Sequence, residues 1–532
     1  SENFTSSDAK LKKIEESKAS QLADLSKTYT LSGFITDSKT GESIPGVNIY
    51  LSGTDYGSST DIDGYFIILD IPQKKYTLNV SYLGYEKIEK ELFLEKNMNY
   101  NFELTVQPLS IEAVTVSDEK LERMNNFQTS RIKLNTFQLR NIPQLADADL
   151  FRSLQSLPGI LVQTDFSTGL VIRGGNTDQN LILLDGITVY NPSHVGGVFS
   201  NFILDAIKEV DLQKGGYNAE YGGRLSAVLK VTSREGNSKQ FRGSTSISAL
   251  AAQTLLEGPL KDGAWIIAGR RTYFDKLFKG TDFYFPYFFY DLQGHLYHDI
   301  DDRRRISLSL YRGEDNLKWD DEFGIEAIWS NNTVSINYRV FHSQTMLSNW
   351  MIAKSKFDIF TGLGRNSSDG IVEKDYIDDL TFRTDWTIFL SKEKSFNFGV
   401  EAKSLDFYYN SSNNGEQIFF LEQKPIESAL YAKYKLSSEQ FLLEPGIRLN
   451  YYDGLDKKWY LDPRLQLKYF INKDRYLNIS IGQYHQFIST LQDDFNPSFI
   501  DAWFATDSSV KPGSSQQITV GIEEYLENDI YF

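Results

Sequence analysis

The stretch LVIRGGNTDQNLILLDGITVY, residues 170–190, decides the fold at the centre of this chain. It predicts a short strand, a step at a glycine pair, a second strand that ends in an Asp-Gly corner, and a third strand. The stretch KGGYNAEYGGRLSAVLKV, residues 214–231, carries two more glycine pairs and another strand. Glycine tolerates positive φ and lets other groups approach the backbone closely. Because no phosphate-binding motif accompanies the pairs, they indicate tight corners in a small β-rich unit.

Composition narrows the class of protein. The 532 residues include 71 acidic and 55 basic side chains, so the formal net charge is -16. This balance argues against nucleic-acid binding, which needs a clustered positive surface. Cysteine is absent, which excludes disulfides, thiolate metal sites and a cysteine nucleophile. No run of 18 apolar residues predicts a membrane-spanning helix, whereas a membrane barrel, whose strands give only a weak alternating signal, remains open.

The N-terminal quarter of the chain separates into two parts. Residues 1–28 are polar and predict a tether or a short helix. Residues 29–107 alternate in short runs between Asp-Gly and Pro-Gly corners every eight to twelve residues, which is typical of a small β-sandwich. Asp61, Asp63 and Gly64 offer too few oxygens for a calcium cage and predict a turn.

Residues 121–236 predict a compact α/β region. The run DADLFRSLQSLPG, residues 147–159, has apolar residues on one helical face, Asp147 or Asp149 as its N-cap, and a Pro-Gly stop. The run NFILDAIKEVDLQKGG, residues 201–216, predicts a short helix that leads into a strand. The stretch 170–190 lies between these two elements.

Residues 237–532 alternate strictly between apolar and polar side chains. Leu477, Ile479 and Ile481 oppose Asn478 and Ser480, for example. About 13 such segments of roughly ten residues are discernible, which is the length that spans a bilayer when tilted. Short corners such as DDRR alternate with long polar ones such as NSSNNGEQ. The pattern favours a transmembrane antiparallel β-barrel, with a soluble propeller or stacked sandwich as the alternative.

Four ordered motifs over about 90 residues carry a resemblance to a known family. They are similar to the plug of TonB-dependent outer-membrane receptors and comprise Leu170–Gly175, Leu181–Tyr190, Ile207–Gly216 and Tyr221–Val231. Their characteristic residues are Gly174, Gly175, Asp185, Gly186, Gly215, Gly216, Tyr221, Gly222 and Gly223. In the N-terminal sandwich, Gly41–Val47, Thr60–Phe66 and Tyr82–Tyr85 resemble the carboxypeptidase-regulatory-like domain.

The resemblance implies a mainly β fold of three domains: a β-sandwich at 29–107, a small α/β plug domain at 121–236, and a transmembrane antiparallel β-barrel from 237 onward. Barrels of this family close with 22 strands. Since only about 13 segments fit, we expect residues 237–532 to be the N-terminal part of such a barrel, which stops at about strand 13–14.

The resemblance also implies functional residues. Arg173 matches a plug arginine that pairs with barrel carboxylates, and Lys214 stands where a second latch arginine is usual; lysine keeps the charge but loses the bidentate fork. Glu444 and Glu523 are candidate partners. The linker 108–120 contains a β-prone hexamer that resembles the TonB box, formed by Ile111, Glu112, Ala113, Val114, Thr115 and Val116. By pattern alone, this hexamer is equally the last strand of the sandwich or a strand free for β-augmentation.

We therefore expect a receptor of the bacterial outer membrane, surrounded by lipid, with its N-terminal domain in the periplasm. It would import a ligand that the sequence does not identify, with force delivered by TonB and its energising complex ExbB–ExbD. A surface lipoprotein and other outer-membrane subunits are further candidate partners. One alternative is a non-transporting subunit of a larger outer-membrane assembly or secretion complex; another is a purely periplasmic or secreted β-rich adhesin. The five histidines are scattered, and no P-loop, nucleophile elbow or HExxH motif occurs. We expect no catalysis, no cofactor and no metal.

Overall fold

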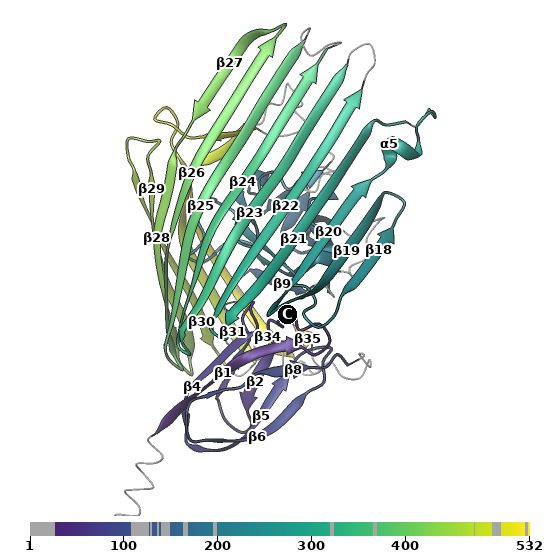
Figure 1. The fold of residues 1–532 in the computed structure, drawn as a ribbon. Coiled ribbons are helices and arrows are strands. Elements are labelled where there is room, and N and C mark those ends of the chain that lie inside the picture. Colours follow the sequence, from purple (N-terminus) through teal and green to yellow (C-terminus); the bar gives the residue numbers. More distant parts are fainter. Residues whose placement is uncertain are drawn as a thin grey trace, which may run out of the picture.

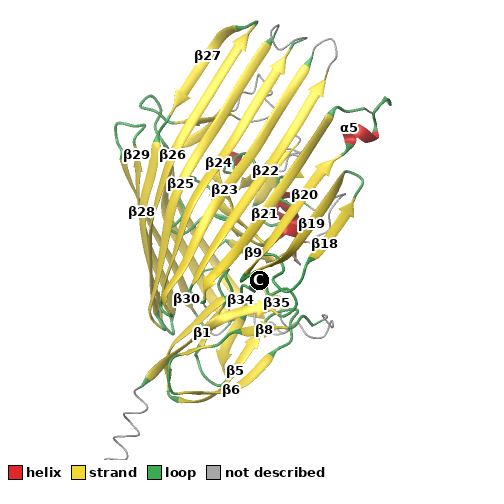
Figure 2. Ribbon diagram, in the orientation of Figure 1, coloured by secondary structure: helices red, strands yellow, loops and turns green. Residues whose placement is uncertain are grey.

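The computed structural model of the protein consists of three β-rich parts (Figures 1 and 2). It describes residues 27–107, 127, 130–135, 138–139, 149–162, 169–194, 199–282, 284–319, 324–364, 370–472, 474–491, 502–526 and 530–531. The predicted N-terminal tether and the hexamer 111–116 lie outside these residues. None of the helices that are described is long and apolar enough to cross a membrane.

The N-terminal part is the predicted sandwich of two sheets. Strand β1 is flanked by β4, β7 and β8 in one four-stranded sheet, and the other runs in the order β3-β2-β5-β6. Leu31 and Ile35 from the first sheet and Ile49 and Val80 from the second meet in one buried core. The strands are β1 (Thr28–Asp37), β2 (Asn48–Leu51), β3 (Gly57–Ser59), β4 (Tyr65–Pro72), β5 (Lys74–Ser81), β6 (Ile88–Leu94), β7 (Met98–Asn99) and β8 (Phe102–Leu104).

The 61–64 segment forms the turn that its sequence predicts. The Asp61 carboxylate accepts hydrogen bonds from the backbone amides of Asp63 and Tyr65 at 3.0 and 2.9 Å. Gly64 has a φ of 74°, where side chains are disfavoured. The aspartates thus organise a corner.

The central part, which we call the plug region, is built on a five-stranded sheet in the order β13-β12-β17-β16-β9. Helix α4 (Leu150–Gln155) packs its buried leucines into the same core as this sheet. Asp149, rather than Asp147, is its N-cap and accepts from the Arg152 amide at 3.1 Å. The remaining elements are β9 (Arg131–Asn135), β10 (Ile160–Val162), β11 (Leu170–Ile172), η1 (Thr177–Gln179), β12 (Asn180–Leu184), β13 (Ile187–Thr188), β14 (Ser193–His194), β15 (Phe199–Ser200), η2 (Leu204–Ala206), β16 (Ile207–Gln213) and β17 (Ala227–Ser233).

The stretch 170–190 folds as predicted, with one addition. It forms β11, β12 and β13, and the turn η1 precedes the second strand. Asp185 and Gly186 have φ values of 51° and 88°, as a tight hairpin turn requires. Strand β12 is buried along its whole length because both faces of the sheet are covered. Ile182 and Leu184 lie in the core that contains α4, and Leu181 and Leu183 pack in a second core with Tyr484 of the third β-rich part.

The third part, which we call the barrel sheet, is a curved antiparallel sheet around the plug region (Figure 1). Among the described residues it has sixteen strands, with β18 at one edge and β35 at the other. They are β18 (Arg242–Ile247), β19 (Ala251–Leu260), β20 (Gly263–Thr272), β21 (Tyr287–Asp301), β22 (Arg304–Trp319), β23 (Ile325–Ser343), β24 (Met346–Leu363), β25 (Ile371–Ser391), β26 (Lys394–Asn413), β27 (Glu416–Gln423), β28 (Ile426–Ser437), β29 (Phe441–Tyr452), β30 (Trp459–Phe470), β31 (Arg475–Gln486), β34 (Gly513–Leu526) and β35 (Ile530–Tyr531). Short α5 (Phe274–Leu277) and the hairpin β32 (Ile488–Leu491)–β33 (Ala502–Ala505) lie between these strands in sequence.

The strand count and one loop differ from the sequence prediction. Sixteen strands replace about 13, and β25 has 21 residues rather than roughly ten. The stretch NSSNNGEQ is no long loop: it closes the β26–β27 hairpin in a tight turn. Asn414 and Gly415 have φ values of 50° and 80° there. Asn-Gly is the favoured pair for such a turn, and its polar flanks resemble a loop only in composition.

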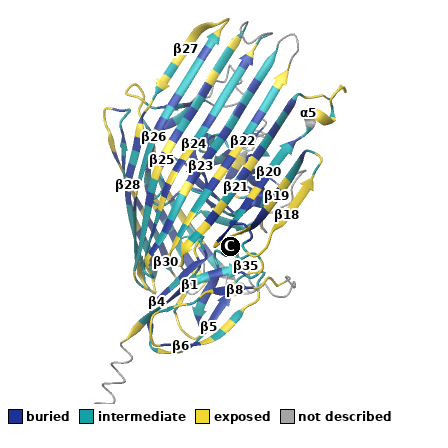
Figure 3. Cartoon of the chain, viewed as in Figure 1, coloured by how far each residue is buried: buried dark blue, intermediate teal, exposed yellow. Residues whose placement is uncertain are grey.

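The barrel sheet is polar inside and apolar outside. On β34, Gln517 and Thr519 contact the plug region, whereas the side chains between and after them point away. Ile518 is 72% exposed and Ile522 63% exposed. Buried and exposed residues alternate along the long strands in Figure 3. Polar side chains inside and apolar side chains outside are typical of strands that face lipid, because a soluble protein rarely exposes a broad apolar surface.

Candidate functional site: the plug–barrel interface

The paired glycines of the plug region lie against side chains of the barrel sheet. A Cβ atom at Gly215 would come within 2.8 Å of the Gln517 Oε1, and one at Gly216 would clash with Ser480. A Cβ at Gly222 would meet the Arg448 guanidinium, with Cζ at 2.7 Å, and one at Gly223 would come within 2.9 Å of the Glu427 Oε1. The doublets therefore serve a close approach between the plug backbone and the barrel wall.

Two buried barrel arginines hold the loop between these glycine pairs. Arg448 donates to the carbonyls of Ala219 and Glu220 at 3.5 and 3.3 Å, and its Nη2 lies 2.7 Å from the Glu401 carboxylate. Arg464 donates to the carbonyls of Tyr217, Asn218 and Tyr221, at 3.1 Å to Tyr217 and 2.7 Å to Tyr221.

Charge-assisted hydrogen bonds of this kind are stronger than neutral ones. The latch thus runs from barrel guanidinium to plug backbone, and we call Arg448 and Arg464 the latch arginines.

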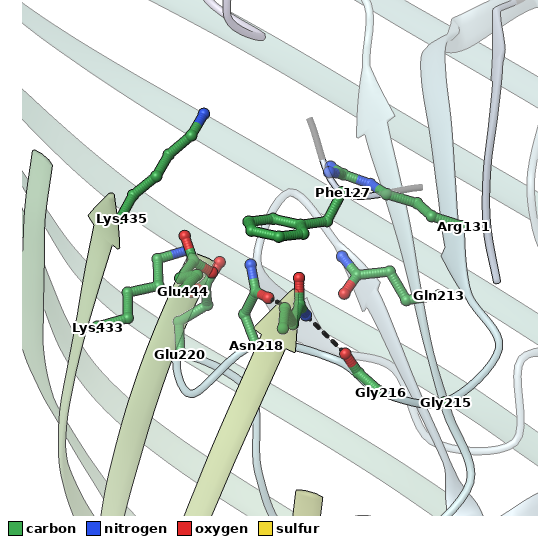
Figure 4. A pocket seen from close by; sticks show the side chains of 11 residues that line it. Phe127, Arg131, Gln213, Gly215, Gly216, Asn218, Glu220, Lys433, Lys435 and Glu444 are labelled. Atoms are coloured by element: carbon green, nitrogen blue, oxygen red, sulfur yellow. Dashed lines mark hydrogen bonds and ion pairs between the residues drawn. The ribbon is translucent and has the colours of Figure 1, made fainter. Parts of the chain in front are cut away.

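Beside the latch arginines lies a polar cavity of about 190 Å³ (Figure 4). In Figure 4 the Phe127 ring lies across its middle, with Lys433, Lys435 and Glu444 on the barrel side and Arg131 and Gln213 on the plug side. Gln466 donates to the Gly216 carbonyl at 2.7 Å, and Lys433 pairs with Glu220 at 2.6 Å. The plug meets the barrel here through polar contacts that water can replace.

The cavity adjoins the start of β9, which is an edge strand of the plug sheet: among the described residues it pairs with β16 alone. Arg131 on β9 forms a two-pronged ion pair with Asp211 on β16, with both N···O distances at 2.8 Å. Burial alone would raise the pKa of Asp211, but the Arg131 guanidinium outweighs it and holds the pKa well below its usual range. The carboxylate therefore stays charged, and this pair closes the end of the sheet.

Arg173 reaches the barrel sheet, but within the described part of the chain it bonds to hydroxyl groups and not to the barrel carboxylates that the resemblance implied. Its Nη1 donates to the Thr519 hydroxyl at 3.1 Å, and its Nη2 donates to the Ser130 hydroxyl. Glu523 is instead engaged by Lys468 at 3.2 Å, and Glu444 lines the cavity of Figure 4.

Lys214 stays inside the plug region, where it donates to the Pro158 carbonyl at 2.6 Å. Burial and, to a lesser extent, the positive charge of Arg173 lower the pKa of Lys214. Neither predicted latch residue makes a described ion pair with the barrel sheet.

The other predicted motif residues organise the plug region itself. The Asp185 carboxylate accepts from the amide and hydroxyl of Ser233 at 2.8 and 2.7 Å and so joins the β12–β13 turn to the end of β17. Gly175 lies against Ser226 inside the region, whereas Gly174, with a φ of 80°, has open space around it. Tyr221 packs in a small core with Tyr217 and Tyr484 of the barrel sheet.

A buried histidine anchors the opposite end of the plug region. His194 on β14 is fully buried, with Nδ1 2.6 Å from Asp315 and Nε2 2.9 Å from Asp291 of the barrel sheet. Burial alone would lower the pKa of His194, but the two carboxylates outweigh it and raise the pKa to about 9. Since both ring nitrogens face carboxylates, both carry protons near neutral pH, and the imidazolium bridges the two aspartates.

Replacing His194 by glutamine should loosen this end of the plug region by about 3–5 kcal/mol, because two buried carboxylates lose their shared cation. The wild-type contribution is complete below the unfolded pKa of about 6.5 and is lost as the pH rises through about 9. Hydrogen exchange of residues 199–206 between pH 7 and 10 measures both effects.

Exchange in the wild type should accelerate above pH 9 beyond the intrinsic rate, whereas the H194Q protein should show no such step. The exposed His298, replaced by glutamine, is the control. Equal protection in H194Q and wild type at pH 7 would contradict the clamp.

Sequence reasoning missed the latch arginines and His194. Arg448 and Arg464 lie on strands more than 200 residues from the carbonyls they bind. His194 is 97 and 121 residues from its two aspartates. The one feature of the sequence that marked the two arginines was a polar side chain on the lumen-facing side of a predicted strand. Many residues of the barrel sheet share this feature, so it does not single them out.

Comparison with protein families identifies two segments. Residues 31–116 match the CarboxypepD_reg-like domain, and residues 128–228 match the TonB-dependent Receptor Plug Domain. TonB-dependent receptors P3 and P26 of Formosa agariphila are 24% and 26% identical over 221 and 211 residues, which are 40% and 38% of this chain. The matches cover 21% and 20% of those two proteins, so the matched part of the chain spans about a fifth of the curated relatives' length.

Solved structures share the fold at low sequence identity. The siderophore receptor PirA from Acinetobacter baumannii superposes with a TM-score of 0.59 at 15% identity, over 76% of this chain and 69% of that one. The outer membrane transporter YddB from Escherichia coli gives 0.57 at 12%, over 75% and 68%. The plug region and barrel sheet therefore have the architecture of these barrels.

Proposed function

Because the chain carries the plug and the carboxypeptidase-regulatory-like domain of the TonB-dependent receptors, we propose that it imports a ligand across the bacterial outer membrane with force supplied by TonB. The observation that carries this proposal is the plug–barrel interface. A five-stranded plug sheet fills the lumen of a barrel sheet that is apolar outside, and latch arginines, polar side chains and a histidine clamp hold it there. Hydrogen bonds and ion pairs in a polar lumen can be broken and remade.

The order of the chain gives the proposal a direction of pulling. The predicted TonB box, residues 111–116, precedes β9, and β9 is the edge strand of the plug sheet. A strand added to the box by TonB would gain its affinity from main-chain hydrogen bonds. Force on the box would reach β9 first and peel it from β16 one residue pair at a time, against the Arg131–Asp211 ion pair and the polar contacts around the cavity of Figure 4.

The rest of the assignment follows from the same architecture. We propose that the barrel sheet lies in the outer membrane with the sandwich on the periplasmic side, and that TonB with ExbB–ExbD is the energising partner. PirA is by name a siderophore receptor, and it shares its fold with this chain at 15% identity.

Deletion of residues 111–116 tests the proposal. The deletion should abolish energised uptake of material recovered with the native protein, identified by mass spectrometry, while equilibrium binding of the same material stays unchanged. The matched control removes six residues from the N-terminal stretch 5–10, which should leave uptake intact. Uptake that survives the 111–116 deletion would contradict the proposed transport mechanism and would favour the alternative that the protein is a non-transporting subunit.

A further inference from the structure

The accessory sandwich is fastened to the plug region and the barrel sheet at once. Glu235, which follows β17, is buried and accepts hydrogen bonds from the amide and hydroxyl of Ser43 in the sandwich, at 3.1 and 2.7 Å. The same carboxylate lies 3.4 Å from Lys208 on β16 and 3.4 Å from Arg305 on β22. Lys208 also donates to the Ile62 carbonyl at 2.8 Å. One buried ionic cluster therefore joins all three parts.

Further contacts fix the sandwich to one side of the barrel sheet. Arg234 bridges Glu42 of the sandwich and Glu257 of β19, at 2.9 and 2.6 Å. Arg339 on β23 pairs with Asp63 at 2.5 Å.

The corner between β23 and β24 adds polar and aromatic contacts. The Tyr65 hydroxyl donates to the Gln344 carbonyl at 2.7 Å, and the Gln344 amide donates to the Ser32 hydroxyl at 2.9 Å. The Tyr65 and Phe341 ring centroids lie 4.6 Å apart. In Figure 1 the sandwich accordingly lies directly beneath the barrel sheet.

The docked sandwich forms part of the wall of a cavity that lies between the plug region and the barrel sheet. This cavity has a volume of about 390 Å³. Its lining includes Ile62 and Asp63 from the sandwich turn, Asp185 and Lys230 from the plug region, and Asn349 and Arg383 from the barrel sheet. Apolar side chains such as Leu183 and Trp386 lie among the charged ones, and the 61–64 turn forms part of the wall. Because the cavity lies between two bodies that separate when the plug moves, it can widen into a passage.

We propose that this cavity is the final part of the route that cargo takes past the plug, and that the accessory sandwich seals it until the sandwich undocks. The inference rests on the proposed function and adds a second barrier to it. Lys208 links the two barriers, because it lies on β16, the partner of the edge strand β9, and holds both Ser43 and Ile62 of the sandwich. Displacement of the plug sheet removes this cation from the dock, so the seal weakens when the plug moves.

A thiol reporter in the cavity tests the seal directly. The chain has no cysteine, so Asn349→Cys in the full chain gives a single reactive group. The probe is ethyltrimethylammonium methanethiosulfonate, a polar cation that reacts with accessible thiols. Reversal of two dock charges on the sandwich, E42R with D63R, places like charges opposite Arg234 and Arg339 and should undock the domain. We expect the reporter to react at least tenfold faster in this variant.

A matched control reverses two exposed charges on β6, E89R with E91R, which lie outside the dock; its labelling rate should equal that of the native sandwich. A second pair reports docking itself. A Cβ built at Gly41 lies 3.4 Å from the Ser238 Cβ, close to the spacing in a disulfide, so G41C with S238C should oxidise in the native protein. The same pair should fail to oxidise when combined with E42R and D63R. A native protein that labels as fast as the undocked one overturns the seal.

Energised cells test undocking during transport. Labelling of Asn349→Cys by the same reagent, which reaches the periplasm through general porins, should rise severalfold when the inner membrane is energised, and a protonophore should abolish the rise. If energisation leaves labelling unchanged while deletion of 111–116 abolishes uptake, the inference fails and the proposed function stands. If the deletion leaves uptake intact, the proposed function fails instead.

Discussion

Replacing the latch arginine Arg448 by methionine should lower the free energy that seats the plug region by about 3–5 kcal/mol. The substitution keeps an unbranched, flexible side chain but leaves Glu401 without its closest cation and the carbonyls of Ala219 and Glu220 without a charged donor. Removing one partner of a buried ion pair typically costs this much, because the other charge stays buried. Arg383, at 3.8 Å, then compensates Glu401 only in part.

The measurement is potassium chloride conductance of the protein in planar bilayers during a urea titration, in which conductance reports release of the plug. The R448M protein should conduct at a clearly lower urea concentration than wild type. Arg475 is the matched control, since its exposed pair with Glu524 should contribute no more than about 1 kcal/mol when replaced by methionine. Identical urea midpoints for R448M and R475M would show that Arg448 does not hold the plug.

Substituting Gly222 by alanine should have a comparable effect through the same arginine. A Cβ at this position would lie 2.7 Å from the Arg448 Cζ and 2.9 Å from its Cδ, so the side chain must move away from Glu401 or the loop must shift. We expect a loss of about 2–4 kcal/mol in plug seating, since overpacking costs about 1–3 kcal/mol and the displaced charge adds to it. The same urea titration measures it.

A double-mutant cycle separates this clash from a general backbone effect. In the R448M background, G222A should cost much less than alone, because the methionine lacks the guanidinium that the new methyl group meets. Gly174 is the control glycine: it also lies in the plug region, but a Cβ there meets nothing within 4 Å. G174A should therefore show only the cost of its positive φ, about 1 kcal/mol. Simple additivity of G222A and R448M would contradict the close approach.

Local patterns predicted most of the elements. Alternation of period two gave the sandwich and barrel strands, since one face of each strand is buried. The Asp-Gly corner at 185–186 and the N-cap at Asp149 depend on near neighbours in sequence. The wrong prediction at NSSNNGEQ arose because composition outweighed the Asn-Gly signal within it. The undercount of strands has a related cause, since β27 begins inside that supposed loop.

The latch could not be predicted for a different reason. Arg448 and Arg464 bind backbone carbonyls, which every residue possesses, so nothing in the plug sequence marks the partner. The resemblance pointed to Arg173, whose side chain instead meets hydroxyl groups of Thr519 and Ser130. The glycine pairs of the plug region were informative. They indicated where the barrel sheet approaches the plug backbone, but not which barrel side chain makes the contact.

The position of the sandwich also determines how a force on the linker 108–120 is divided between the sandwich and the plug region. The sandwich ends near Gln107 and the plug sheet begins at Arg131, and each of the two has its own contacts with the barrel sheet. A force applied to the linker between them acts on both sets of contacts at once, those of the sandwich and those of the plug region. Each set of contacts then carries only a share of the force. When the weaker set breaks, the other set carries the whole force. The two attachments therefore share a weak pull, and the plug region carries the full force only once the sandwich attachment has given way.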